Sequence, residues 1–172
     1  MKENGKYLYH GRFIKFAVMA ALLVPLGLAG CSSKTSTGLI TNSSGGKYRT
    51  GSIGQFEQEV GKVVRFTTDS TKLNDEARRI LAAQARWLNR YAQYSILLEG
   101  HADERGTREY NIGLGAQRAD AVRRYLASRG VNPSRIRTIS YGKERPVALC
   151  DNISCWSQNR RVVTILNNRA GS

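Results

Sequence analysis

The amino-acid sequence predicts a two-layer α/β sandwich, an α+β domain in which helices pack on a mixed four-stranded sheet. Two observations support this fold class. Short apolar runs typical of strands alternate with two long helical patterns in the order β-α-β-α-β-β, which implies at least one right-handed crossover. The 172 residues contain no visible internal repeat and are enough for one such domain with additional segments.

The first half of the domain contains two strand patterns with a helix between them. KVVRF at residues 62–66 is typical of a strand. Residues 74–93 predict a helix, because Asn74 can cap its start and acidic residues fill its first turn. Its expected buried stripe is Ala77, Leu81, Gln84, Leu88 and Tyr91. SILLE at residues 95–99 is apolar on both faces, as expected of a strand covered by helices.

The second half begins with a helical pattern from about residue 109 to residue 128, which Gly130 is placed to terminate. Residues 132–142 predict a short turn followed by a third strand. Residues 157–166, SQNRRVVTIL, predict a brief helical turn and a final strand.

The N-terminal segment, residues 1–30, has the pattern of a secretory signal. A start rich in lysine and arginine precedes FAVMAALLVPLGLAG, an apolar run that is shorter than the roughly 20 residues a spanning helix needs. The run closes on LAGC, which resembles the lipobox of bacterial lipoproteins. This resemblance implies cleavage after Gly30 and a diacylglyceryl group on the thiol of Cys31. The alternative is an ordinary signal peptide with a chance cysteine.

Residues 31–58 are expected to form a lipidated start and a flexible linker. Ser, Thr and Gly dominate from residue 32 to about residue 54. Such a linker has a root-mean-square reach of about 26 Å. The sequence therefore predicts three parts: a cleaved signal (1–30), a tether (31–58) and a folded domain (59–169).

The two remaining cysteines, Cys150 and Cys155, form an even pair in an exported chain. A short-range disulfide is the natural interpretation in an oxidising compartment, and two free thiols are the alternative. A zinc site is disfavoured, since two cysteines and the one histidine left after cleavage are too few soft ligands. No metal site is therefore predicted.

The chain is strongly basic. Lys and Arg number 27 against 13 Asp and Glu, a net charge of +14, and removing residues 1–30 leaves 23 against 12, or +11. Such a charge favours an anionic partner. Nucleic acid is not expected, because an exported lipoprotein does not meet it routinely. Lipopolysaccharide, phospholipid head groups and cell-wall carboxylates remain.

A dense, sign-mixed cluster, GHADERGT at residues 100–107, follows the second strand. It faces an anomaly in the next helix, where Arg118 falls inside the apolar stripe of the helical wheel. A guanidinium there needs acceptors, because arginine does not discharge. It could bridge to Asp103 or Glu104, snorkel to the surface, or line the edge of a pocket whose other wall is the cluster.

These residues also carry a family resemblance. EGHADERGTREYNIGLGAQRADAVRRYLASRGV, SYGKERP and SQNRRV are similar to the OmpA-like peptidoglycan-binding domain, over about residues 62–168. The resemblance implies a non-catalytic site for the diaminopimelate of the peptidoglycan stem peptide, with Asp103 and Arg118 as the principal pair and Asp69 and Leu114 lining it. Asp103 would meet the ligand's ammonium, and Arg118 would hold its carboxylate in a bidentate pair.

The sequence departs from the family pattern at one position. An aromatic residue usually precedes the acid that ends the first strand, whereas Thr68 precedes Asp69 here. Four further polar residues are expected to be scaffold. Glu104 and Arg105 would form loop-fixing ion pairs, Asn111 would be a cap, and Arg160 would be a surface or partner contact.

The resemblance and the lipobox together imply a lipid-anchored protein on the periplasmic face of the outer membrane. They also imply TolB and the Tol complex as partners, with no cofactor besides the covalent lipid. One alternative is an OmpA-like wall-binding lipoprotein outside the Tol system. Another is a wall-acting hydrolase using His101, Asp103 and Glu104, disfavoured by the lack of a second ligand cluster or a convincing nucleophile.

Overall fold

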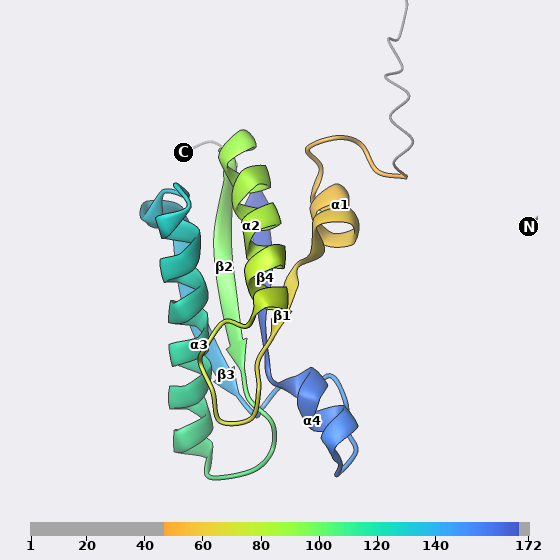
Figure 1. Ribbon diagram of the computed structural model, residues 1–172, viewed down its shortest axis with the longest axis vertical. Helices are drawn as coiled ribbons and strands as arrows, with labels where there is room; N and C mark the ends of the chain where they lie inside the picture. Colours follow the sequence, from red (N-terminus) through yellow and green to blue (C-terminus); the bar gives the residue numbers. More distant parts are fainter. Residues whose placement is uncertain (1–46, 169–172) are drawn as a thin grey trace, which may run out of the picture. The chain divides into compact units, whose positions relative to one another are not determined.

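The computed structural model describes residues 47–168 (Figure 1). The predicted signal, Cys31 and most of the predicted tether therefore lie outside the described residues. The elements are α1 (Ile53–Gln55), the π-helical turn η1 (Phe56–Gly61), β1 (Val63–Arg65), α2 (Asp75–Arg90), β2 (Tyr94–His101), α3 (Arg108–Ser128), the 3₁₀ turn η2 (Pro133–Arg135), β3 (Ile136–Gly142), α4 (Ile153–Asn159) and β4 (Arg161–Asn168). Within residues 47–168 every helix is too short or too polar to cross a bilayer.

The four strands form one mixed sheet in the order β1-β4-β2-β3. β2 and β3 are parallel and are connected through α3, whereas β4 runs antiparallel to both β1 and β2. Figure 1 shows α2 and α3 covering one face of this sheet, with the β1–α2 and β2–α3 loops at the same end. The predicted two-layer fold and its β-α-β-α-β-β order are confirmed.

Helix α2 follows its predicted pattern up to Arg90, three residues before the predicted end, and Tyr91 is its half-buried C-cap instead of a member of the buried stripe. The side chain of Asn74 accepts a hydrogen bond from the amide of Ala77 at 2.8 Å, which caps the first turn. The polar member of the buried stripe, Gln84, is fully buried and fully bonded: its Nε2 donates to the carbonyl of Gly61 at 2.7 Å, and its Oε1 accepts from Thr164 Oγ1 at 3.0 Å. Burying this amide therefore costs little, because each polar atom has a partner.

Helix α3 approaches β2 through two glycines. A Cβ atom on Gly100 would overlap the carbonyl oxygen of Gly115, and a Cβ atom on Gly115 would collide with Ser140 Oγ. Only glycine at both positions lets the backbone of α3 lie this close to the sheet. This contact places the N-terminal half of α3 directly against the end of β2.

One face of the sheet is open, although the SILLE run of β2 is apolar on both faces. Residues Leu97 and Glu99 of β2 are half-buried, and Ile139 of β3 is 40% exposed. β2 is therefore covered by helices on one face only, as in the predicted two-layer fold, so the apolar character of both faces of SILLE does not mean that both faces are covered. An apolar run of five residues does not distinguish these two cases.

The folded part also begins earlier than residue 59. Ser52 caps a helical segment, its Oγ accepting from the amide of Gln55 at 3.2 Å. Phe56 is fully buried and packs on Trp87, with ring centroids 5.0 Å apart. The carbonyl of Gly51 accepts from Tyr94 Oη at 2.8 Å. The Ser- and Gly-rich composition of this stretch hid these few core contacts, so the predicted end of the tether at residue 58 is corrected.

The predicted disulfide is present. Cys150 and Cys155 are bonded, with their Cα atoms 5.5 Å apart, and Cys155 lies in α4. This helix starts at residue 153, earlier than the single turn expected from residue 157. Asn152 caps it, accepting from the amide of Ser154 at 3.0 Å.

Candidate functional site

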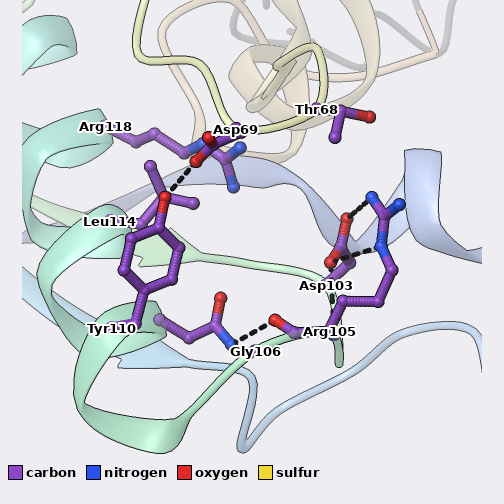
Figure 2. A pocket seen from close by; sticks show the side chains of 9 residues that line it. Thr68, Asp69, Asp103, Arg105, Gly106, Tyr110, Leu114 and Arg118 are labelled. Atoms are coloured by element: carbon purple, nitrogen blue, oxygen red, sulfur yellow. Dashed lines mark hydrogen bonds and ion pairs between the residues drawn. The ribbon is translucent and has the colours of Figure 1, made fainter.

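A cavity of about 320 Å³ opens at the end of the sheet where β2 meets α3. It is lined by Thr68, Asp69, Asp103, Arg105, Gly106, Tyr110, Asn111, Leu114 and Arg118 (Figure 2). The structure thus brings all four residues of the predicted site, Asp69, Asp103, Leu114 and Arg118, to one place. Three chain segments supply them: the β1–α2 loop, the β2–α3 loop and the first turns of α3.

The β2–α3 loop is held in shape by its own polar groups. Thr107 caps α3, its Oγ1 accepting from the amide of Tyr110 at 3.2 Å. Asn111 closes the loop instead of capping the helix, since its Nδ2 donates to the carbonyls of Arg105 at 2.7 Å and Thr107 at 3.0 Å. Gly106 adopts φ +86°, a left-handed conformation that favours glycine.

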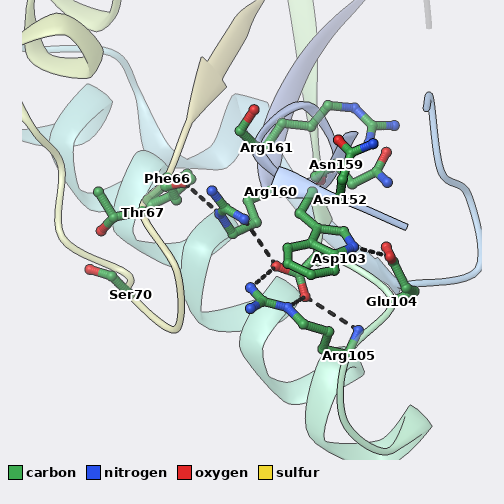
Figure 3. A network of polar contacts seen from close by, with 12 residues as sticks. Phe66, Thr67, Ser70, Asp103, Glu104, Arg105, Asn152, Asn159, Arg160 and Arg161 are labelled. Carbon is green, nitrogen blue, oxygen red and sulfur yellow. Dashed lines mark hydrogen bonds and ion pairs between the residues drawn. The ribbon is translucent and has the colours of Figure 1, made fainter. Parts of the chain in front are cut away.

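Asp103 is buried and already paired with two guanidinium groups (Figure 3). Its Oδ2 accepts from Arg105 Nη2 at 2.7 Å and from Arg160 Nη1 at 3.1 Å, and its Oδ1 accepts from Arg105 Nε at 3.2 Å. Burial by itself would raise the pKa of Asp103, but the hydrogen bonds from Arg105 and Arg160 outweigh it and leave the pKa below its ordinary value. The Asp103 side chain is therefore a carboxylate at neutral pH.

The expectation that Arg160 is a surface or partner contact was wrong. Its side chain is 7% exposed, and its Nε donates to the carbonyl of Phe66 at 3.1 Å while its Nη1 holds Asp103. No local pattern indicates this role, because Arg160 and Asp103 are 57 positions apart in the chain. The expected ion pair of Arg105 is present, and its guanidinium also lies 4.3 Å from the ring centroid of Trp156. The expected ion pair of Glu104 was wrong: its carboxylate forms no ion pair within residues 47–168 and accepts from Trp156 Nε1.

Arg118 is fully buried, and its guanidinium donates to backbone carbonyls. The sequence-based alternatives of a salt bridge or a snorkelling side chain did not include this arrangement. Its Nε donates to Ser70 at 2.9 Å, its Nη1 to His101 at 2.9 Å and its Nη2 to Thr67 at 3.2 Å. Burial lowers the pKa of Arg118 to about 10, against the opposing effect of Asp103, so the group stays charged at neutral pH. A guanidinium has five N–H donors. One N–H on each Nη therefore has no acceptor within residues 47–168.

Asp69 differs from Asp103 in both exposure and bonding. It is exposed, adopts φ +50°, and its Oδ1 accepts from Tyr110 Oη. The hydrogen bond to Asp69 raises the pKa of Tyr110. Figure 2 shows the carboxylate of Asp69 beside the guanidinium of Arg118, with Tyr110 and Leu114 next to them. The sequence-based reasoning did not single out Tyr110, although it lies in the quoted family motif.

His101, the histidine of the hydrolase alternative, is 2% exposed, and neither ring nitrogen has a hydrogen-bond partner within residues 47–168. Its nearest carboxylate oxygen, on Glu99, is 3.9 Å away. Burial, with the nearby charges of Arg161 and Arg145, lowers the pKa of His101 to about 4. The ring is therefore neutral at pH 7. Across residues 47–168, no three His, Cys, Asp or Glu side chains are grouped so that they could hold a metal ion.

The chain is similar to a set of bacterial envelope proteins. A sequence model of the OmpA family matches residues 65–160. A peptidoglycan-associated lipoprotein of Mesorhizobium japonicum is 54% identical over 158 residues, covering 90% of this chain and 94% of the relative. A peptidoglycan-associated lipoprotein of Rhizobium meliloti is 55% identical over 160 residues, covering 90% of this chain and 89% of the relative. The crystal structure of the peptidoglycan-associated lipoprotein from Burkholderia pseudomallei matches with a TM-score of 0.60 at 42% identity, covering 62% of this chain and 90% of that one.

The environment of His101 predicts a pH dependence of stability. The unfolded chain takes up this proton near pH 6.5, whereas the folded protein resists it down to about pH 4. Stability should therefore be complete above pH 6.5 and fall on acidification, by about 2 kcal/mol between pH 7.5 and pH 5. Urea unfolding of the chain from residue 32 onward at several pH values measures this slope, since His101 is then the one histidine present. The His101→Phe variant should lack the slope, and an equal slope in both proteins would contradict the assignment.

Proposed function

The chain belongs to the OmpA family, and on that basis we propose that it binds peptidoglycan non-covalently through the cavity of Asp69, Asp103, Leu114 and Arg118. The observation that supports the proposal most strongly is the convergence of two carboxylates and one buried guanidinium on a single cavity. The relatives' name, peptidoglycan-associated lipoprotein, supports the same polymer as ligand. The proposed role is binding and anchoring, without catalysis and without a cofactor other than covalent lipid.

The ligand group that fits this cavity is the free end of diaminopimelate in the stem peptide. This end carries an ammonium and a carboxylate on the same carbon, so it needs an anion and a cation close together. The two remaining N–H groups of Arg118 have no acceptor within residues 47–168, and a charge-assisted bond from a fixed guanidinium to a carboxylate is strong. Because the Arg118 side chain is fully buried, the adjacent Asp69 and Tyr110 would have to shift to admit the ligand. Because Arg118 is held by three carbonyls, it is already oriented before the ligand arrives.

The ammonium would sit between Asp69 and Asp103. Asp69 has spare acceptor capacity, since Tyr110 is its hydrogen-bond partner within residues 47–168 and the carboxylate is exposed. Asp103 is fully occupied by Arg105 and Arg160, but the Arg105 side chain is 41% exposed and can swing away toward solvent. We therefore propose that ligand binding replaces Arg105 on Asp103 and leaves Arg160 in place.

The methylene chain of the ligand needs apolar contact, which Leu114 supplies from α3. Thr68 lines the cavity where the family usually has an aromatic residue. Tyr110, 51% exposed, presents an aromatic ring from another wall of the same cavity. Tyr110 can therefore replace part of the apolar contact that Thr68 lacks.

We further propose that the protein is anchored through lipid on Cys31 to the periplasmic face of the outer membrane. The lipobox and the relatives' names as lipoproteins support this placement. The protein would then connect the outer membrane to the cell wall and support envelope integrity and membrane constriction during division.

Participation in the Tol system, with TolB as a direct partner, is the finer part of the proposal. One surface suits a protein partner: Val147, Leu149 and Ile153, around the disulfide, are 59%, 89% and 62% exposed. Val147 and Leu149 lie in the β3–α4 loop and Ile153 begins α4, and exposed apolar side chains on one short segment often mark interaction sites. The alternative is a wall-binding lipoprotein of the same family that works outside the Tol system.

Wall-type discrimination tests the binding site. Protein lacking residues 1–31 should cosediment with diaminopimelate-type sacculi and largely ignore lysine-type sacculi. Lysine keeps the ammonium but lacks the carboxylate for Arg118, and leaving this buried guanidinium unpaired should cost about 2–5 kcal/mol. Arg118→Lys should lose most of the preference, because an ammonium cannot reproduce the guanidinium's geometry.

Two further variants control that experiment. Asp69→Asn, at an exposed position, should stay folded and weaken binding to both wall types. Arg123→Ala removes an exposed arginine of the same helix and should leave binding unchanged. Equal cosedimentation of the wild type with both sacculi, together with a folded and unimpaired Arg118→Lys, would show that Arg118 has only a structural role.

Removal of the proposed lipid site gives a separate test. Cys31→Ser should block palmitate labelling and leave unprocessed precursor outside the outer membrane. Normal labelling and normal fractionation of this variant would contradict lipid attachment at Cys31, without bearing on the wall site.

Capture of purified TolB tests the Tol assignment. Immobilised protein should retain TolB, and Leu149→Ser with Ile153→Ser should reduce retention, because apolar contact area is lost. The matched control is Ile139→Ser, which removes an exposed apolar side chain from the open face of the sheet. Wild-type protein that retains no TolB would favour the alternative outside the Tol system.

A further inference from the structure

Exposed cations gather at the end of the domain opposite the cavity. We call this group the basic end: Lys47, Arg49, Arg86, Arg90 and Arg129. All five side chains are exposed, and within residues 47–168 none of them forms an ion pair. Arg90 and Arg129 stack on the rings of Tyr91 and Tyr125, which leaves their charge unneutralised, so all five can meet an external anion.

The fold brings these five residues together from three segments. α2 and α3 run in the same direction, and Asn89 Nδ2 donates to the carbonyl of Arg129 at 2.9 Å, which joins the C-terminal ends of the two helices. The hydrogen bond from Tyr94 to Gly51 holds the first described residues at that same end. In Figure 1 this segment, in orange, enters at the end away from the β2–α3 loop.

Acidic residues are concentrated at the other end. The β1–α2 loop, the first turn of α2, the β2–α3 loop, the first turn of α3 and the loop between β3 and α4 contain Asp69, Asp75, Glu76, Asp103, Glu104, Glu109, Glu144 and Asp151. The acid nearest the basic end is Glu59, which lines a groove with Arg86 and Arg90 and accepts from Gln55 Nε2 at 3.0 Å. The same segments also carry six bases, so their net charge is only −2, whereas the five residues of the basic end carry +5. The six bases are Lys72, Arg78, Arg105, Arg108, Lys143 and Arg145.

Helix dipoles account for only part of this separation. Arg90 and Arg129 lie at the C-terminal ends of α2 and α3, where a cation stabilises the helix. Arg86 lies a full turn before the end of α2, and Lys47 and Arg49 precede the first helix, so none of these three is explained in that way.

We propose that the basic end docks on the anionic phospholipid head groups of the membrane leaflet that carries the lipid anchor. This inference rests on the proposed attachment at Cys31. The segment between Cys31 and Lys47, if it is the flexible tether that its composition predicts, has a root-mean-square reach of about 22 Å. It delivers the chain to the basic end, so the cations stay close to the lipid surface. Docking there points the cavity away from the membrane, toward the wall.

The expected strength follows from the number of cations. Each Lys or Arg near an anionic surface contributes a factor of roughly five to binding. A short tether gives a high effective concentration, so even a weak surface contact is populated. Since the contact is electrostatic, it should disappear at high salt.

The test uses the full mature protein, lipidated and inserted in vesicles, with an acceptor dye on the lipid head groups. A donor dye is placed on α3 at Ser128→Cys, near the basic end, or at Gly113→Cys, near the cavity. The two positions are roughly 22 Å apart along the helix. In vesicles containing phosphatidylglycerol, energy transfer should be stronger from position 128 than from position 113. In phosphatidylcholine alone, or at high salt, this difference should vanish.

Charge variants test whether the cations of the basic end cause the docking. Arg86→Gln, Arg90→Gln and Arg129→Gln together should lower the docked-to-free ratio by roughly a hundredfold. The matched control, Arg65→Gln, Lys72→Gln and Arg145→Gln, removes the same charge elsewhere and should leave transfer unchanged.

Three outcomes would overturn the proposal: equal transfer from both positions in anionic vesicles, an unaffected Arg86, Arg90 and Arg129 variant, or an equal effect of the control. Energy transfer that does not depend on phosphatidylglycerol, together with loss of sacculus binding in the Arg86, Arg90 and Arg129 variant, would show that the basic end binds wall carboxylates instead. Protein that fails to insert at all would contradict the lipid anchor, which is a separate failure.

Discussion

One buried guanidinium organises the cavity end of the domain. Arg118 has no exposed surface, and because its charge persists at neutral pH, its N–H groups need acceptors inside the protein. Three of its five N–H groups have an acceptor within residues 47–168. They donate to the carbonyls of Thr67, Ser70 and His101, which belong to the β1–α2 loop and the end of β2. The helix that carries Leu114 is thereby tied to the two segments that carry the carboxylates. The group proposed to hold the ligand also holds its own site together.

Part of the chain's positive charge is buried and therefore unavailable to a partner. Residues 47–168 contain 21 Lys and Arg against 12 Asp and Glu, an excess of nine. Four of these arginines, at positions 118, 135, 160 and 161, are buried, and all four donate to backbone carbonyls. Much of the basic character therefore serves the fold, where it supplies donors to carbonyls that helices and strands leave unpaired. Only the exposed remainder, which includes the five residues of the basic end, is available to an anionic partner.

The two carboxylates of the cavity have different physical situations. Asp103 is buried, and it is stable there because two guanidinium groups offset the loss of hydration. Asp69 is exposed, in a left-handed backbone conformation that few residues other than glycine, asparagine and aspartate adopt readily. One carboxylate thus belongs to a buried network in which Arg160 is buried and Arg105 is exposed, while the other carboxylate remains open to solvent. A site of this kind combines a rigid frame with exposed groups that can exchange partners.

The sequence by itself determined the order of the elements, the cap at Asn74, the disulfide pair and four of the nine residues that line the cavity, because each leaves a local or family pattern. Only the tertiary structure decided which residues contact each other across long distances in the chain. The partners of Arg118 are carbonyls, which every residue has, so no side-chain pattern could reveal them. Arg160 reaches Asp103 across 57 positions, and Phe56 enters the core from a segment whose composition indicated a linker. Whether helices pack on one face of β2 or on both also depends on the tertiary fold. In each case the deciding contact joins residues far apart in the chain, and only folding brings them together.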